Sequence, residues 1–334
     1  MARQRIPVTL EDVARASGYS RATVSRVVNG LGSVDPAIAA EVREAIRRTG
    51  YSVNTAARTL AGGSAHMVGL LFAESFRELF QNPYWGEIVE GLSATLAERD
   101  YRESFLVRDH QHRLDDYLAQ RSLDAVVIMS PQPQDRLESR LVKLGIPVVV
   151  FGEPRDARKT SAAMIDEERT GALAAQLFAE TGRRHPVVIS GREDMQVSRR
   201  RVAGFADACA RTGIRLAEGR ITSGDFTVDG GHHAMNALLS RQRRIDSVFA
   251  CSDRMALGAL RALHERGLRV PDDIAVIGVD GTVLGEQAQP QLTSVGADLA
   301  AIGRELGNLT LEAIASQPSR RVVFEPNLVR RVSA

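Results

Sequence analysis

The chain has 334 residues, enough for two or three domains. Its 44% hydrophobic and 25% charged residues are ordinary for a soluble globular protein, and no apolar run approaches the roughly 18 residues of a membrane span. Cys209 and Cys251 exclude a disulfide framework and lack metal-ligand spacing, and no apolar signal region follows the N-terminus. We therefore expect a cytoplasmic protein that needs no cofactor or metal and does not bind membranes. Residues 1–62 carry a net charge of +4 and the remainder −2, which favours a basic head that binds a polyanion, although chance over 62 residues would also give this imbalance.

Three helices are predicted at the N-terminus, each behind a capping residue: Leu10–Ser17 behind Thr9, Arg21–Asn29 behind Ser20, and Pro36–Thr49 behind Asp35. Two short helices joined by a turn at Gly18, with a third closing the core, are typical of a helix-turn-helix. The valines of the second helix point inward and leave a polar face, made of Arg21, Ala22, Thr23, Ser25, Arg26 and Asn29. Arginine can bond guanine in the major groove, and hydroxyl side chains can reach phosphates. A plain three-helix cap with a solvated basic face would show the same pattern.

Residues 54–61 need a separate interpretation. Eight residues are too few for a stable isolated helix in water, and Gly62 and Gly63 follow as a flexible joint. We expect this segment to be helical only when another surface holds it.

From Met67 onward, apolar strands alternate with helices. Strands are predicted at residues 67–72, 105–107, 125–129, 148–151, 186–189, 247–250 and 274–279, and helices near residues 84–99, 114–121, 136–144, 198–212 and 253–266. This alternation predicts two doubly wound lobes with parallel sheets covered on both faces, and a ligand site in the cleft between them, beyond the carboxyl ends of the strands. No phosphate-binding or nucleophile motif is present, and the paired histidines, such as His232 and His233, are expected in exposed loops. The sequence therefore disfavours an enzyme.

The N-terminal residues closely resemble the DNA-binding head of the lactose-repressor/galactose-repressor (LacI/GalR) family. The resemblance is dense and ungapped through Val8 to Ala14, Gly18 to Ser20, Thr23 to Asn29, Val42, Ile46, Gly50, Tyr51, Asn54, Ala57, Arg58, Leu60 and Ala61. It implies that Thr9, Ser20 and the polar face of the second helix contact DNA, together with Asn54, Ala57 and Leu60 of a hinge helix. In that family the hinge folds on operator DNA and its leucine, here Leu60, enters the minor groove. Packing of Leu60 on the body is the alternative.

Residues 67–334 resemble the effector-binding core of the same family, which is similar to periplasmic sugar-binding proteins. The resemblance rests on the runs 82–85, 145–147, 204–205, 224–226, 255–260, 270–274, 278–280 and 292–294, and on Arg201. It implies ligand contacts from Tyr84, Trp85, Asp166, Arg201, Phe226, Ser252 and Asp280. A carboxylate and a guanidinium suit a polyol, and aromatic rings suit a sugar face. Ordinary structural roles remain open for each: a turn cap for Asp280, a helix cap for Asp166, an exposed position for Arg201 and core packing for the aromatics.

Four departures from the family pattern fall on the cleft side. Ser252 stands where the family often has Asn, Gly152 where it often has Asp, and Gly281 where a second Asp is usual. The stretch from Ala73 to Gln81 is also longer than the family's loop. The identity of the ligand therefore does not follow from the resemblance.

These observations predict an all-α helix-turn-helix head with a hinge helix, followed by an α/β two-lobed body like that of periplasmic binding proteins. We expect the head at residues 1–53, the hinge and linker at 54–64, and the body at 65–334, with lobe one at about 65–165 plus 295–324 and lobe two at about 166–290 plus 325–334. The predicted function is a transcriptional repressor whose affinity for operator DNA is controlled by a small molecule, with a sugar favoured. The predicted partners are a pseudo-palindromic double-stranded operator and a second copy of the chain, and binding to DNA would associate the protein with the nucleoid. A purine-type regulator that requires a corepressor, a small-molecule carrier and an enzyme are the alternatives.

Overall fold

The computed structural model describes residues 8–29, 34–51, 64–107, 122–131, 136–217, 219–242 and 244–334. The chain divides into two compact units, a head (Met1–Ala65) and a body (His66–Ala334). The predicted hinge at residues 54–61 and the predicted helix at residues 114–121 lie outside the described residues. None of the described helices is both long and apolar enough to span a membrane.

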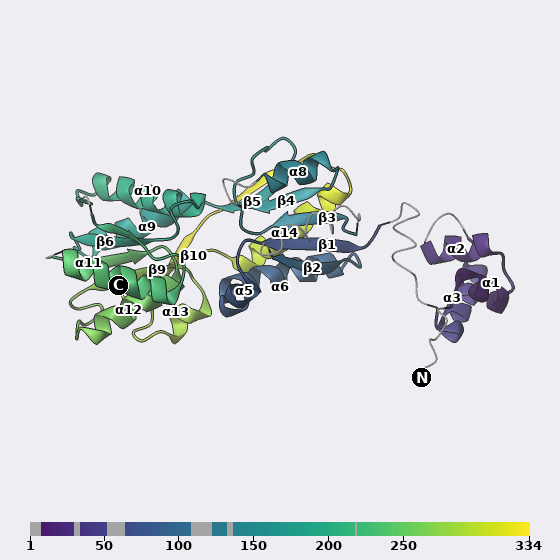
Figure 1. Ribbon diagram of the computed structural model, residues 1–334, viewed down its shortest axis with the longest axis horizontal. Helices are drawn as coiled ribbons and strands as arrows, with labels where there is room; N and C mark the ends of the chain where they lie inside the picture. The colour runs from purple at the N-terminus through teal and green to yellow at the C-terminus, as the bar shows by residue number, and fades with distance from the viewer. Residues whose placement is uncertain are drawn as a thin grey trace. The chain divides into compact units, whose positions relative to one another are not determined.

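In its described residues the head has three helices with the predicted bounds: α1 (Leu10–Ser17), α2 (Arg21–Asn29) and α3 (Pro36–Thr49) (Figure 1). Val13, Val24 and Val42 are fully buried and bring one residue from each helix into a common core. This small core explains why three short helices, each marginal alone, hold one another in place.

Lobe one of the body is built on a six-stranded parallel sheet with the order β11-β5-β4-β3-β1-β2. Its strands are β1 (Met67–Phe72), β2 (Arg102–Val107), β3 (Ala125–Ile128), β4 (Val148–Phe151), β5 (Ser161–Ile165) and β11 (Arg321–Phe324). Its helices are α5 (Phe76–Gln81), α6 (Pro83–Ala97), α8 (Leu137–Lys143) and α14 (Leu299–Ile314). Side chains of α6 and α14 pack with one face of the sheet and those of α8 with the other.

Lobe two repeats this plan with a sheet of order β12-β10-β9-β8-β6-β7. Its strands are β6 (Pro186–Ser190), β7 (Ile221–Ser223), β8 (Ser247–Ala250), β9 (Ala275–Asp280), β10 (Thr293–Gly296) and β12 (Asn327–Val329), and only β12 runs antiparallel to its neighbour. Its helices are α9 (Glu167–Glu180), α10 (Gln196–Arg211), α11 (Val228–Arg241), α12 (Asp253–Glu265) and α13 (Val283–Gln287). The predicted doubly wound architecture is confirmed for both lobes.

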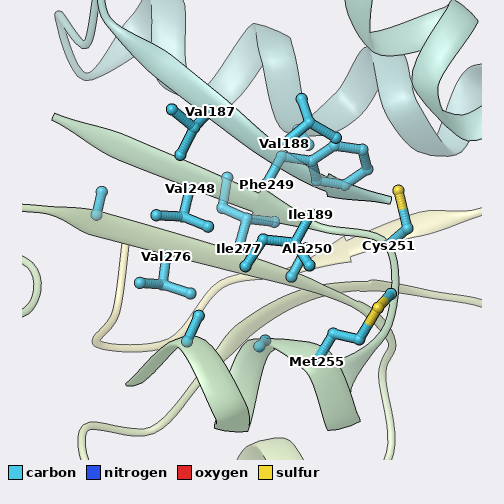
Figure 2. Close-up of a cluster of buried hydrophobic side chains, with 14 of the residues drawn as sticks. Val187, Val188, Ile189, Val248, Phe249, Ala250, Cys251, Met255, Val276 and Ile277 are labelled. Atoms are coloured by element: carbon cyan, nitrogen blue, oxygen red, sulfur yellow. The ribbon is translucent and has the colours of Figure 1, made fainter. Parts of the chain in front are cut away.

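The core of lobe two is a continuous apolar layer between strands and helices (Figure 2). Val188 and Phe249 lie on adjacent strands in register, and Met255 of α12 packs on the same cluster. The Phe249 ring stacks on Phe205 of α10, and α10 approaches α9 so closely that a Cβ on Gly204 would lie 2.0 Å from the carbonyl oxygen of Glu168. Both faces of the sheet are therefore closed to solvent, and its carboxyl edge is left to form a site.

The chain passes between the two lobes three times: from β5 to α9, from β10 to α14, and from β11 to β12. Residues of both sheets therefore meet near these crossings. The sequence analysis placed the start of the second strand at residue 105, whereas β2 begins at Arg102. It did not predict the helices α5, α9, α11, α13 and α14 or the strands β5, β7, β10, β11 and β12.

Candidate DNA-binding head and effector cleft

Local hydrogen bonds fix the turn between α1 and α2. Thr9 forms a capping box with Asp12, and the hydrogen bonds from Thr9 hold the pKa of the Asp12 carboxyl below its ordinary value. Gly18 ends α1 with a φ of 77°, a conformation that favours glycine. The Ser20 hydroxyl then accepts the Thr23 N–H at 3.2 Å, which starts α2. These contacts hold the two helices in the predicted helix-turn-helix arrangement.

The outer side of α2 presents the predicted DNA-contacting residues. Arg21, Ala22 and Arg26 are exposed, and Thr23 and Ser25 are partly exposed. Arg21 forms an exposed ion pair with Glu11 at 2.8 Å, whereas Arg26 has no ion pair among the described residues. Arg26 is therefore available to a partner. The side chains of the predicted contacts Asn29, Asn54, Ala57 and Leu60 lie outside the described residues.

A cavity of about 520 Å³ lies between the two lobes of the body. Its volume falls within the range of about 300–1,000 Å³ for small-molecule sites. Six of the seven predicted ligand contacts line it: Tyr84, Trp85, Arg201, Phe226, Ser252 and Asp280. Asp166 does not line the cavity. Its carboxylate accepts the Arg169 N–H at 2.9 Å and caps α9, which is the alternative role that the sequence analysis left open.

Arg201 is the most deeply embedded charge in the cavity wall. Its Nε and Nη2 donate to the Glu167 carboxylate at 2.5 and 3.1 Å, and its Nη1 donates to the Cys251 carbonyl at 2.8 Å. The side chain is only 5% exposed, so an exposed position for Arg201 is excluded. Burial opposes the charged form of Arg201, but the carboxylates of Glu167 and Asp280 outweigh it and raise the pKa of the guanidinium. Arg201 therefore stays charged and holds a fixed place.

Asp280 ends β9 with a φ of 117°, outside the range that a regular strand adopts. One carboxylate oxygen lies 3.8 Å from Arg201 Nη1, and the other accepts a long hydrogen bond of 3.4 Å from the Asp253 N–H. Burial raises the pKa of Asp280 well above its ordinary value, and Arg201 only partly offsets this. Asp280 therefore keeps acceptor capacity that a ligand hydroxyl could use.

Ser252 and Asp253 support this end of the cavity. The Ser252 hydroxyl caps α12 by accepting the Met255 N–H at 3.2 Å. Asp253 accepts hydrogen bonds from Thr282 and from the Ser294 hydroxyl, the latter at 2.6 Å. Burial raises the pKa of Asp253 to about 6. These residues link the ends of β8, β9 and β10 around Asp280.

Aromatic rings form the apolar part of the lining. Tyr84, Trp85 and Phe151 of lobe one have ring centroids 5.1–6.3 Å apart. Phe226 of lobe two has a φ of 67°, and its ring contacts Gly191, where a Cβ would lie 2.0 Å from the ring. Apolar rings on both lobes suit the carbon face of a sugar.

Sequence reasoning missed several lining residues, including Glu74, Glu153, Glu167 and Arg254. Glu153 joins the lobes, since its carboxylate accepts the Gln196 amide at 3.0 Å and pairs with Arg200. Within the described parts of the chain, no group of three His, Cys, Asp or Glu side chains is arranged to hold a metal ion.

The comparisons with known proteins agree with this architecture. Residues 9–54 match the family described as bacterial regulatory proteins, lacI family, and residues 175–334 match a periplasmic binding protein-like domain. The HTH-type transcriptional regulator CelR of Thermobifida fusca is 37% identical over 100% of both chains, and catabolite control protein A of Priestia megaterium is 31% identical over 89% of each. A solved complex of the transcriptional regulator CelR with cellobiose has a TM-score of 0.78 at 36% identity, covering 98% of this chain and 100% of that one. The chain therefore belongs to the LacI family of DNA-binding transcriptional regulators.

Proposed function

We propose that the protein is a cytoplasmic repressor that binds a pseudo-palindromic operator as a homodimer and changes its operator affinity when a sugar fills the cleft. The observation that carries the proposal is the cavity, where Asp280 and Arg201 stand beside aromatic rings from both lobes. Carboxylate and guanidinium groups bond hydroxyls, and the rings cover apolar sugar faces. The cellobiose held by the related CelR supports a sugar as the ligand class.

The fold offers a route from the cleft to DNA. A ligand that contacts both lobes favours one angle between them, because the three chain crossings act as hinges. A change in lobe angle would alter the spacing of two heads in a dimer and so the fit to two half-sites. The coupling between the two sites need be only about 1–3 kcal/mol to act as a switch.

No catalytic step is part of this proposal. The relatives are transcriptional regulators. In the cavity wall, the Glu167 carboxylate and the Cys251 carbonyl hold Arg201 in place, an arrangement that suits ligand binding. A second ligand class, purines acting as corepressors, is tested by the same experiment.

The test is a thermal-shift screen of the full chain against mono- and disaccharides and purines, followed by calorimetry on each ligand that raises the melting temperature. A ligand at 100 times its dissociation constant adds about 2.7 kcal/mol to the free energy of unfolding. Stabilisation by a sugar, lost in Asp280→Asn, supports the proposal. Stabilisation by purines alone would replace the sugar with a purine as the proposed effector. Turnover of a bound sugar would contradict the proposal that the protein acts without a catalytic step.

A further inference from the structure

The segment that begins at Ala73 and is longer than the family's loop folds into α5 at the edge of the cavity. The Ser75 hydroxyl accepts the Glu78 N–H, and the Glu78 carboxylate accepts the Ser75 N–H at 3.0 Å. This capping box fixes the start of α5. It therefore also fixes the direction of Glu74, which precedes the capping residue Ser75. Glu74 and Glu78 both line the cavity.

Glu74 is held at the carboxyl edge of the sheet of lobe one. It follows β1, and Ser130 follows the neighbouring parallel strand β3. The Ser130 hydroxyl lies 3.0 and 2.9 Å from the two carboxylate oxygens of Glu74. Ligands of doubly wound sheets bind at this edge, so Glu74 lies at the ligand-binding edge of lobe one, as Asp280 lies at that of lobe two.

The Glu74 carboxyl group forms no ion pair among the described residues. Burial opposes its charged form and raises its pKa, although the hydrogen bond from Ser130 acts in the other direction. Arg192 of lobe two, which also lines the cavity, is already bound in a bidentate pair with Asp194 at 3.1 and 2.7 Å. A carboxylate has about four acceptor sites, and the Ser130 hydroxyl and the backbone N–H groups of Ala73 and Glu74 leave part of this capacity unused.

The rest of the lining indicates what kind of donor would fill that capacity. Glu74, Tyr84 and Asp280 all line the cavity, so carboxyl groups from both lobes share it with this aromatic residue. Arg254 also lines the cavity and forms no ion pair among the described residues. A cavity with free acceptors and a free donor matches hydroxyl groups, which both donate and accept. A carboxylate or phosphate on the ligand would be repelled by Glu74.

We propose that Glu74, positioned by Ser75 and supported by Ser130, is a specificity-determining ligand contact in lobe one, and that it restricts the effector to an uncharged polyhydroxyl compound. This inference rests on the proposed sugar-binding function and adds to it a residue and a charge class. The ligand then bonds one carboxylate in each lobe and so links them.

The binding test compares wild type, Glu74→Ala and Glu74→Gln by calorimetry with cellobiose, its acidic derivative cellobionic acid, and the cationic dimer of glucosamine. Glu98→Gln, the same change at an exposed site in lobe one, is the control. We expect wild type to bind cellobiose more tightly than the two charged sugars. Glu74→Ala should bind cellobiose at least about 10-fold more weakly than wild type does, and Glu74→Gln should show a smaller preference for cellobiose over cellobionic acid. Unchanged cellobiose affinity in Glu74→Ala, or tighter binding of the cationic dimer by wild type, would overturn the proposal.

A second measurement needs no ligand. If Glu74 serves a ligand, Glu74→Gln removes a costly buried charge, keeps an acceptor for Ser130, and leaves the melting temperature unchanged or raised. A lower melting temperature than in Glu98→Gln would show a structural role and overturn the inference. Failure of wild type to bind any of the three sugars would contradict the proposed sugar effector, while the ligand-free result would still decide the role of Glu74.

Discussion

Replacing Arg201 with alanine should destabilise the body as well as weaken effector binding. The guanidinium and its partner carboxylate on Glu167 are only 5% and 14% exposed, and Arg201 also holds the Cys251 carbonyl. Breaking a buried ion pair by removing one partner costs about 3–5 kcal/mol, since the other charge is left uncompensated. At about 2–4 °C per kcal/mol for a unit of 150–250 residues, the melting temperature should fall by about 6–20 °C.

Urea and thermal unfolding of the full chain, followed by circular dichroism, measure this loss. Arg330→Ala is the matched control, because its pair with Glu180 is 59% and 58% exposed and should contribute less than about 1 kcal/mol. The double variant Arg201→Met with Glu167→Gln should recover part of the stability, since Glu167 is no longer left unpaired, while Asp280 still loses the nearby guanidinium. A free energy of unfolding for Arg201→Ala within about 1 kcal/mol of wild type would refute the reasoning.

Three further predictions follow from other parts of the molecule. Gly204→Ala should lower the free energy of unfolding by about 1–3 kcal/mol, because its Cβ would meet the backbone of α9. Gly86→Ala on α6, with open space around it, should raise the free energy of unfolding by up to about 1 kcal/mol. Urea unfolding of both variants distinguishes the effect of packing from that of helix propensity. Burial raises the pKa of Asp253 to about 6, so the folded state binds this proton more tightly than the unfolded state does. Proton binding by Asp253 therefore adds to the free energy of unfolding at low pH, and this contribution should be lost as the pH rises from about 4 to 6. Asp253→Asn should flatten that slope, and an unchanged slope in this variant contradicts the assignment. Hydrogen bonds from Arg269 lower the pKa of the Asp273 carboxyl to about 2, so this group contributes stability above about pH 4 that is lost as the pH falls through about 2. Asp273→Asn should therefore lower the free energy of unfolding above about pH 4 and make no difference once the wild-type carboxyl is protonated. Arg26→Ala should reduce the preference for operator over random DNA by about 1–3 kcal/mol, the contribution of a bidentate guanine contact. Anisotropy titrations on both DNAs measure this preference. An equal loss of affinity for both DNAs would instead make Arg26 a phosphate contact.

The sequence predicted best the elements whose ends carry their own chemical signals. The bounds of α1 to α3 follow from Thr9, Gly18 and Asp35, which cap or end helices through bonds to nearby residues. The six residues of α5 are too few to show a helical period, so its capping box at Ser75 went unnoticed.

The site was predicted less completely because its contacts are long-range. The position of Asp166 in the sequence did not decide its role. A residue between the end of a strand and the start of a helix can either cap the helix or face the cleft. The Glu167 partner of Arg201 lies 34 residues away in the sequence, and the Ser130 partner of Glu74 lies 56 residues away. No periodicity reports such pairs, because the first forms between the helices α9 and α10 and the second between residues that follow the parallel strands β1 and β3.

The central claim is that the occupied cleft changes the affinity of the head for DNA. The direct measurement is the anisotropy of a labelled operator, selected from random DNA by the full chain, titrated with and without the sugar that calorimetry shows to bind. We predict a change in operator affinity of about 5- to 150-fold, with a fall marking an inducer and a rise a corepressor, and no comparable change in Asp280→Asn. Identical titrations with the cleft empty and saturated would contradict the account.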